Sequence, residues 1–551
     1  MRYIYGENRR KTEGVIEIPN RGAGSPKKDK FIMVKYKHVL ALNPYFGDGT
    51  TVLGIFPPTG LEYIIASMKP LVGKITFLDL RDEKAYQDPK KLSEFIRAEI
   101  DLVCITIGWE TKFKKICDFV SQLPPEITTI VGGYKATLEV DYLFERCPNI
   151  DMIVRGEGEE TIQQIVKGIP HKDILGLSYR ENGRVIHNEN HLLPDVANIP
   201  FPDRSLRKHE HYIVQQGVRL SSHTFDTILS ARGCPFKCKF CTFSLNPLGQ
   251  KRSYTERPVE SVIEELKTIT ADVVLFSDDN FSTNPKRSEK LCDMIIANNI
   301  RKTFVIQTRI DIANHPVLLD KAWKAGFRIF LIGIESPHDW ILKLIQKGIT
   351  QQQIRDAFAV LTKYDFFLHG YFIYGNIGET EEEMVYIAKF AKELKLDSIS
   401  FQKLRIEKLS PLKEVVESTP GYYYKRIGGA VFSDRYGPEE LKRIRNRIRA
   451  RFYDLSQIIH IADKARRIGL FRFRDLMVAL PNLPLLLWRL LTRKKRKKKE
   501  KTNRPQMHLP AVDNISHPGH DAGPQQANMR IRIDETNQKR QIDLKSPTSP
   551  G

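Results

Sequence analysis

Short apolar runs alternate with amphipathic segments along the first third of the chain. The runs are rich in β-branched residues and cover 38–42, 75–79, 102–106, 128–131 and 152–154. Helical patterns, such as those over 60–70 and 111–122, lie between them. Buried parallel strands that alternate with helices specify a doubly wound, Rossmann-like sheet, whose ligand crevice lies at the carboxyl ends of the strands. We therefore predict an α/β domain over 37–168.

A second alternation of strands and helices follows, after a linker over 169–222. Within 259–266 the apolar residues recur at i, i+3, i+4 and i+7, which is the period of a helix. Repeated strand–helix units form a parallel barrel, whose chemistry lies on the loops that follow the strands. The sequence predicts a partial (β/α)6 TIM-type barrel over 223–420. Its strands are expected to begin near Thr227, Val273, Thr303, Arg328, Phe367 and Ser398.

The remaining segments differ in pattern from both blocks. A helical C-terminal extension is predicted over 421–500, and the Pro-, Gln-, Asn- and Ser-rich segment 501–551 is predicted to be disordered. Residues 1–36 form a basic leader without an apolar core of signal-peptide length, so we expect the protein not to be secreted. The extension carries an apolar stripe expected to face the core, formed by Leu441, Ile444, Ile448, Phe452, Leu455 and Ile459.

The charge of the chain is unevenly distributed. The formal net charge is +21, and residues 489–501 hold nine Lys or Arg and one Glu. The apolar segment 476–488 precedes this run, is broken by Pro481 and Pro484, and is shorter than the roughly 20 residues that span a bilayer. An apolar segment with a polybasic flank favours peripheral contact with an anionic membrane through 476–501. The alternative is a helix packed on the core, followed by a solvated charged tail.

Three cysteines lie within eight residues, at Cys234, Cys238 and Cys241. Three thiolates on one tight loop can hold three irons of a cubane cluster and leave the fourth iron open for a ligand. Zinc is an alternative, but structural zinc sites take four ligands, usually from two paired knuckles, and the sequence has no second knuckle. A chance clustering of structural cysteines is the remaining alternative. The other cysteines lie in apolar surroundings, which favours a reducing, cytoplasmic compartment. Contact of 476–501 with a membrane would place the protein peripherally on the inner face of that membrane.

With Phe240 directly before its last cysteine, the triplet resembles the signature of the radical S-adenosylmethionine (radical SAM) enzymes. The resemblance implies a [4Fe-4S] cluster whose open iron binds S-adenosylmethionine, which one electron then cleaves to a 5′-deoxyadenosyl radical. It also implies an external electron donor of the ferredoxin or flavodoxin type. Polar residues follow the predicted strands where the barrel rule expects chemistry. The resemblance assigns to S-adenosylmethionine Phe240, Asp278, Asp279, Gln307, Arg309, Glu335, Ser336 and Tyr374.

Helix capping is the alternative for several of these positions. Asp278, Ser336 and Thr380 each precede a helical pattern, where short polar side chains cap helices. Capping explains any one of them, but it explains less well a set on consecutive strand ends of one barrel.

The first domain resembles the cobalamin-binding domain of B12-dependent radical SAM enzymes. The resemblance covers roughly 37–168 and rests on motifs such as Val131-Gly-Gly-Tyr134 and Arg155-Gly-Glu-Gly-Glu159. The D-x-H-x-x-G motif is absent from the loop 43–49, which implies cobalamin held without a histidine ligand. The alternative is a scaffold that has lost its cofactor. The residues assigned to cobalamin are Asn43, Thr106, Gly108, Gly132, Gly133, Gly156 and Glu157.

Together these resemblances imply a cobalamin-dependent methyltransferase that acts on an unactivated carbon of a small-molecule or lipid-like substrate. The alternative is an oxidative cyclase or rearrangement enzyme, with or without cobalamin, that transfers no methyl group. A sensor without turnover fits less well, because the polar residues of the barrel mouth are present. Nucleic acid is an unfavoured partner, because no β-rich RNA-binding domain follows residue 420. No residue in the sequence marks the substrate or the hydrogen donor.

Overall fold

The computed structural model describes residues 14–17, 31–46, 56–108, 112–215, 218–241, 246–406, 409–425 and 429–484. The segment predicted to be disordered and the polybasic run lie outside these ranges, as do residues 47–49 of the loop 43–49. The described part of the leader contains an antiparallel pair, β1 (Gly14–Glu17) and β2 (Phe31–Val34). No helix among the described residues is long and apolar enough to cross a membrane.

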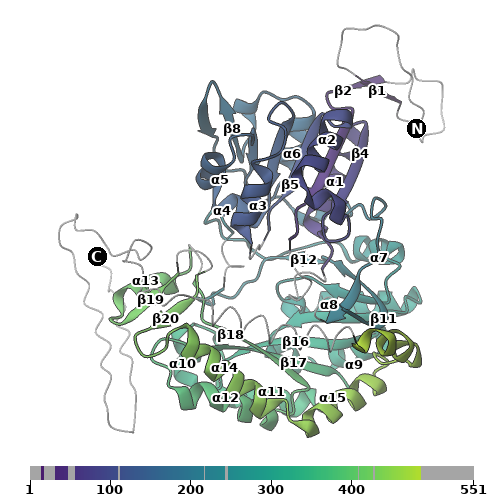
Figure 1. Ribbon diagram of the computed structural model, residues 1–551. Helices are drawn as coiled ribbons and strands as arrows, with labels where there is room; N and C mark the ends of the chain where they lie inside the picture. The colour runs from purple at the N-terminus through teal and green to yellow at the C-terminus, as the bar shows by residue number, and fades with distance from the viewer. Residues whose placement is uncertain are drawn as a thin grey trace, which may run out of the picture.

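The N-terminal domain is a seven-stranded sheet with helices on both faces (Figure 1). The strand order is β4-β3-β5-β6-β7-β8-β9, and the first five strands are parallel. The strands are β3 (His38–Asn43), β4 (Lys74–Asp79), β5 (Leu102–Thr106), β6 (Thr128–Gly132), β7 (Met152–Val154), β8 (Leu177–Glu181) and β9 (Arg184–His187). The antiparallel hairpin β8–β9 therefore adds part of the expected linker 169–222 to this sheet.

Two apolar layers hold these helices against the sheet. One layer packs beneath α2, α3 and α5, and the other beneath α1 and α6. Burial on both faces explains why the parallel strands read as continuous apolar runs in the sequence. The helices are α1 (Thr59–Met68), α2 (Pro89–Glu99), α3 (Phe113–Val120), α4 (Tyr134–Leu138), α5 (Val140–Arg146) and α6 (Glu159–Val166).

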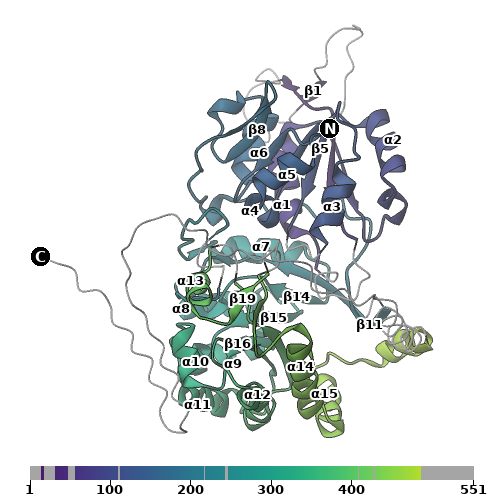
Figure 2. The same ribbon diagram turned by 60° about the vertical axis from the view of Figure 1, so that its left-hand side comes forward.

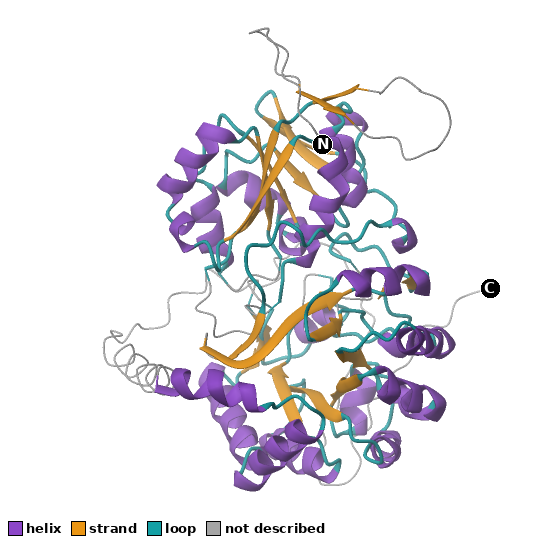
Figure 3. Cartoon of the chain, turned by 90° about the vertical axis from the view of Figure 1, so that its right-hand side faces the viewer, coloured by secondary structure: helices purple, strands orange, loops and turns teal. Residues whose placement is uncertain are grey.

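The second domain is a curled, open half-barrel with its helices on the outer side (Figure 3). The sheet order is β10-β11-β14-β15-β16-β17-β18, in which β11 to β18 are parallel and β10 adds an antiparallel edge. The strands are β10 (Tyr212–Gln215), β11 (Val218–Ile228), β14 (Val273–Phe276), β15 (Thr303–Thr308), β16 (Phe327–Glu335), β17 (Phe367–Tyr374) and β18 (Ser398–Lys403). The six predicted parallel strands are thus present, but the first begins at Val218 rather than near Thr227, and only its end, Phe225–Ile228, pairs with β14.

Successive side chains on these strands point alternately to an outer core beneath the helices and to the barrel interior. On β16, Phe330 and Ile332 pack in the large core beneath the helices, whereas Leu331 faces the interior beside Val305 of β15. Thr350 and Thr380 begin helices as capping boxes with Gln353 and Glu383. The helices are α7 (Val259–Thr268), α8 (Pro285–Ala297), α9 (Pro316–Ala325), α10 (Asp339–Leu344), α11 (Gln351–Leu361), α12 (Glu381–Glu393) and α13 (Leu412–Ser418). Short 3-10 helices cover Lys69–Leu71, Lys84–Gln87, His171–Asp173, Val196–Asn198, Phe281–Thr283 and Ile310–Asn314.

The C-terminal extension begins with a hairpin of β19 (Tyr422–Tyr424) and β20 (Val431–Ser433). Two helices follow, α14 (Pro438–Phe452) and α15 (Leu455–Arg467), and a last helix is described over 473–484. The expected apolar stripe is buried as far as Phe452, whereas Leu455 and Ile459 are exposed. The stripe ends there because Asp454 caps a new helix and so breaks the helical period.

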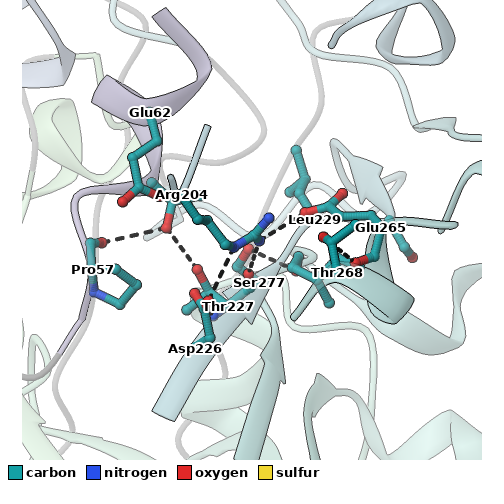
Figure 4. Close-up of polar contacts among 12 residues, drawn as sticks. Pro57, Glu62, Arg204, Asp226, Thr227, Leu229, Glu265, Thr268 and Ser277 are labelled. Carbon is teal, nitrogen blue, oxygen red and sulfur yellow. Dashed lines mark hydrogen bonds and ion pairs between the residues drawn. The ribbon is translucent and has the colours of Figure 1, made fainter. Parts of the chain in front are cut away.

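A buried network of ion pairs joins the two domains. Figure 4 shows its members Glu62, Arg204, Asp226 and Glu265. Arg207 of the linker binds Glu62 of α1 and Asp226 of β11, with Nη2 2.7 Å from Glu62 Oε2 and Nη1 2.8 Å from Asp226 Oδ2. Arg204 connects Asp226 to Glu265 of α7 through bonds of 3.0 and 2.7 Å. The linker therefore fixes the sheet of the first domain above the barrel.

Candidate active site

The three cysteines lie on the loop between β12 (Ala231–Arg232) and β13 (Thr255–Glu256). Figure 1 shows β12, from which this loop starts, at the junction of the two domains. Cys238 is buried, and Cys234 and Cys241 are half-buried. Gly233, which precedes the first cysteine, has a φ of +87°, and a Cβ there would lie 2.5 Å from the Ser253 carbonyl oxygen. Only glycine allows the chain to enter the loop along this path.

Asp278 and Asp279, which follow β14, both bind the backbone at the start of this loop. Asp278 Oδ1 accepts hydrogen bonds from the N–H groups of Ser230 at 2.6 Å and Ala231 at 3.1 Å. Asp279 Oδ2 accepts one from the N–H of Gly233 at 2.8 Å. Burial raises the pKa of both carboxyl groups, that of Asp279 to about 6. In the structure these carboxylates position the loop, and their contact with S-adenosylmethionine stays a prediction.

The donor set of the loop fits an iron–sulfur cubane. None of the seven cysteines, all of which the structure describes, forms a disulfide bond. Among the described residues, no three His, Cys, Asp or Glu side chains converge as the ligands of a single metal ion do. A cubane makes a different demand, because each thiolate binds its own iron. Three thiols from one short loop can meet that demand and leave one iron open.

A group of charged side chains lies against the buried cysteine. Arg309, after β15, points Nη1 toward Cys238 Sγ at 3.9 Å and stacks 3.7 Å from the ring centre of Phe236. Its Nη2 donates to the Lys347 carbonyl at 2.9 Å. Lys347 Nζ in turn lies 2.9 Å from Glu335 Oε1, and both side chains are buried. Arg309 and Glu335, predicted from strands β15 and β16, are thus brought together around Lys347.

The remaining predicted residues have different surroundings. Phe240 lies 5.9 Å from Lys347 Nζ, measured to the ring centre, and so belongs to the same group. Gln307 is half-buried on β15, two residues after the interior residue Val305. The hydroxyl of Ser336 accepts from the N–H of His338, which is the contact of a serine turn before α10 and not of its N-cap. Tyr374 packs in the outer core with Phe401, away from the barrel interior, so only its backbone can face a ligand there.

A cavity of about 230 Å³ lies at the carboxyl ends of strands β5, β6 and β7. Of the residues predicted for cobalamin, Asn43 and Gly108 are outside its lining. Gly133, with φ of +106°, would place a Cβ 2.6 Å from the Ile107 carbonyl, and a Cβ on Gly60 would meet no atom within 4 Å. Glycine and aliphatic walls let a large cofactor approach the backbone, so the lining fits cobalamin. The predicted residues in the lining are Thr106, Gly132, Gly133, Gly156 and Glu157.

One wall of this cavity comes from the barrel domain. Arg232, two residues before the first cysteine, lines the cavity and donates to Glu157 at 2.5 Å and to Glu159 at 2.6 Å. The cavity of the first domain therefore reaches strand β12, which leads into the cysteine loop. No local pattern in the sequence marks Arg232 or Lys347, because their partners lie in other elements.

Comparisons with known proteins agree with this geometry. The family profile of the Radical SAM superfamily matches residues 228–391, and that of the B12 binding domain matches residues 47–166. The uncharacterized methyltransferase PH0819 of Pyrococcus horikoshii is 33% identical over 359 residues, which are 63% of this chain and 75% of the relative.

More distant relatives carry names of two kinds of reaction. The anaerobic magnesium-protoporphyrin IX monomethyl ester cyclase of Cereibacter sphaeroides is 26% identical over 62% of this chain and 57% of its own length. The hopanoid C-3 methylase of Methylococcus capsulatus is 24% identical over 51% of this chain and 53% of its own length. The chain thus spans little more than half the length of these two relatives.

A solved structure shares the fold. The radical S-adenosylmethionine methyltransferase TsrM of Kitasatospora setae has a TM-score of 0.56 at 16% identity, over 72% of this chain and 78% of that protein. The cysteine loop, the glycine-lined cavity and both family profiles lead to one conclusion. The chain belongs to the radical SAM superfamily, among the enzymes with an N-terminal B12-binding domain, and its cofactors are a [4Fe-4S] cluster, S-adenosylmethionine and cobalamin.

Proposed function

We propose that this enzyme transfers a methyl group, by way of cobalamin, to an unactivated carbon of a small-molecule or lipid-like substrate. The observation that carries the proposal is Arg232, because it joins the cobalamin cavity to the cysteine loop. The two cofactor sites therefore both adjoin the short strand β12. When bound, the cluster with S-adenosylmethionine supplies one-electron chemistry and cobalamin supplies a transferable methyl group.

The side chains of the protein bind and orient the ligand and shield the reaction centre from solvent. Arg309 and Lys347 place two cations beside the buried Cys238 and Glu335, which suits a ligand with both a carboxylate and hydroxyl or amino groups. The apolar interior residues Val305 and Leu331 lie in one apolar cluster with Phe56 of the first domain. A dry interior protects a reactive carbon centre from solvent.

The proposal also covers the reductant, the cellular compartment and the substrate class of the enzyme. The external reductant is of the ferredoxin or flavodoxin class. The enzyme works in the cytoplasm, in keeping with seven cysteines that form no disulfide. The lipid-like substrate class is supported by the methylases among the relatives, whose names describe hopanoids.

The first test is the change Cys238→Ala in anaerobically reconstituted enzyme. Loss of one thiolate removes a ligand of the cluster, so reductive formation of 5′-deoxyadenosine from S-adenosylmethionine should fall to the level of the enzyme-free reaction. The measurement is chromatography of the nucleoside products. Cys292→Ala, a change at a buried cysteine of the barrel core outside the loop, is the matched control and should retain cleavage. Cleavage unchanged in Cys238→Ala would refute the cluster assignment.

Methyl transfer is tested with methyl-labelled S-adenosylmethionine. Lipid and water-soluble cell extracts serve as substrate pools, and label in a product is the expected result. One relative is named a magnesium-protoporphyrin IX monomethyl ester cyclase. A cyclase or rearrangement enzyme would form 5′-deoxyadenosine and a modified product without label. That outcome would leave the cluster chemistry intact and reject methyl transfer.

A further inference from the structure

The last described helix, over 473–484, is held on the barrel by its polar side. Asp475 is 1% exposed, and its Oδ1 accepts hydrogen bonds from the N–H of Ser222 at 2.6 Å and the hydroxyl of Ser221 at 3.1 Å. Both serines belong to β11. The half-buried Val478, Ala479 and Asn482 follow at helical spacing on the same side. Small and polar residues thus face the protein.

The large apolar side chains of this helix face solvent. Phe473 is 77% exposed, Met477 65% and Leu480 61%. They recur at i, i+4 and i+7, and Leu476 and Leu483 extend the same face. A helix packed on a core has the opposite orientation, with its apolar side inward. The alternative considered from the sequence, a helix whose apolar residues pack on the core, is therefore wrong for 473–484.

The charge near this face is strongly positive. Arg472 directly precedes the helix, Arg474 lies in its first turn, and both are exposed. The sequence continues from residue 484 with Leu485-Leu-Leu-Trp488 and then with the run 489–501, which has nine Lys or Arg and one Glu. Figure 2 shows the helix projecting from the side of the barrel beside β11, clear of the N-terminal domain. The apolar face and the basic run lie next to each other along the chain.

We propose that the apolar face of helix 473–484 docks on an anionic membrane surface. An apolar helical face next to basic residues matches the boundary between acyl chains and anionic headgroups. A second copy of the chain is a poorer occupant, because two runs of this charge repel each other. A nucleic acid leaves the apolar face unexplained. The proposal concerns where the enzyme works and does not depend on which reaction it catalyses.

The test is flotation of the full-length protein with vesicles of phosphatidylcholine, with and without 30% phosphatidylglycerol. The variant Phe473→Gln/Met477→Gln/Leu480→Gln removes the apolar face and leaves Asp475 and the basic run unchanged. We expect the wild type to float with anionic vesicles, to float less in high salt, and to bind at least tenfold more strongly than the variant. Cleavage of S-adenosylmethionine should be the same in both proteins, which separates this test from that of the proposed function.

The matched control is Leu455→Gln/Ile458→Gln/Ile459→Gln. These residues of α15 are also 73%, 53% and 61% exposed, so the control removes a similar apolar area from another helix. It should float like the wild type. Equal flotation of wild type and the 473/477/480 variant would overturn the proposal, as would equal binding to neutral vesicles. Sedimentation that shows a dimer in the wild type, but a monomer in this variant, would assign the face to a second copy instead.

Discussion

Buried carboxyl groups of the barrel bind and position the segments that surround the reaction centre. Asp278 accepts hydrogen bonds from N–H groups just before the cysteine loop, and Asp279 accepts one from the first residue of the loop. Glu335 forms an ion pair with Lys347. Glu335 does so with a φ of +70°, a conformation that costs a non-glycine residue energy. Such strain persists only where surrounding contacts impose it, which here are the ion pair with Lys347 and the pairing of β16 with β17.

Glu379, in the glycine-containing turn after β17, gives a pH-dependent prediction. Its side chain is buried, Oε2 accepts from the Asn376 N–H at 2.8 Å, and burial raises the pKa of the carboxyl to about 8 from 4.5. The folded protein therefore binds one proton more than the unfolded chain between pH 4.5 and 8, so stability falls as pH rises across this window. Glu379→Gln, which cannot ionise, should remove a slope of up to about 1.4 kcal/mol per pH unit.

Thermal unfolding of both proteins at pH 5, 6, 7 and 8 measures this slope. The control is Glu382→Gln, which removes a carboxylate that lies near Glu379 in the sequence but is exposed to solvent. The interpretation fails if Glu379→Gln and wild type lose stability in parallel as the pH rises.

The short strand β12 and the loop after it connect the two cofactor sites. Arg232 extends from this strand to Glu157 and Glu159 at the start of α6, and the next residue enters the cysteine loop. The two carboxylates and Arg232 therefore link the start of α6 directly to the strand that leads into the cysteine loop. Arg232 also lies 5.7 Å from the ring centre of Tyr63 in α1, a third contact from the first domain.

The change Arg232→Gln should weaken cobalamin binding by about tenfold, which corresponds to about 1.4 kcal/mol. It leaves Glu159 without the cation that binds it, and Glu157 with Arg252 alone, whose Nε lies 3.3 Å from Glu157 Oε1. Repulsion between the two carboxylates then opens the wall that Arg232 forms. Absorbance titration with hydroxocobalamin measures the affinity, and the iron content of the same samples reports the cysteine loop. Arg184→Gln, at an exposed position of β9 in the same domain, is the control. An unchanged affinity at full iron content would contradict the role of Arg232.

The sequence predicted elements better than it predicted contacts between them. The parallel strands that begin at Val273, Thr303 and Phe367 were located correctly, because β-branched runs and following helices are local patterns. Pairs such as Arg232 with Glu157, 75 residues apart, leave no such local pattern. The loss of the apolar stripe after Phe452 has a related cause, because one capping residue, Asp454, starts a new helix and shifts the period.

The orientation of the two domains depends on buried charges at their junction. Glu62 is completely buried, and its carboxylate binds Arg207, which also binds Asp226 (Figure 4 shows Glu62 and Asp226). Thr59 and Thr227 add a hydrogen bond of 2.7 Å between α1 and β11. Removing one partner from a buried pair leaves an uncompensated charge, whereas an exposed pair contributes little. The network therefore makes the domain arrangement sensitive to single residues.

Arg207→Met should destabilise the junction by about 3–5 kcal/mol, because Glu62 and Asp226 would remain buried without this cation. Calorimetry should show a lower transition temperature and a separation of the two domains into distinct transitions. Lys69→Met breaks the ion pair with Asp203 at the same junction, but Lys69 is half exposed, so we expect a loss of at most about 1 kcal/mol. The double variant Glu62→Gln/Arg207→Met should recover part of the loss, because it removes one orphaned charge. If Arg207→Met and Lys69→Met have equal effects, the junction is held by packing rather than by its buried charges.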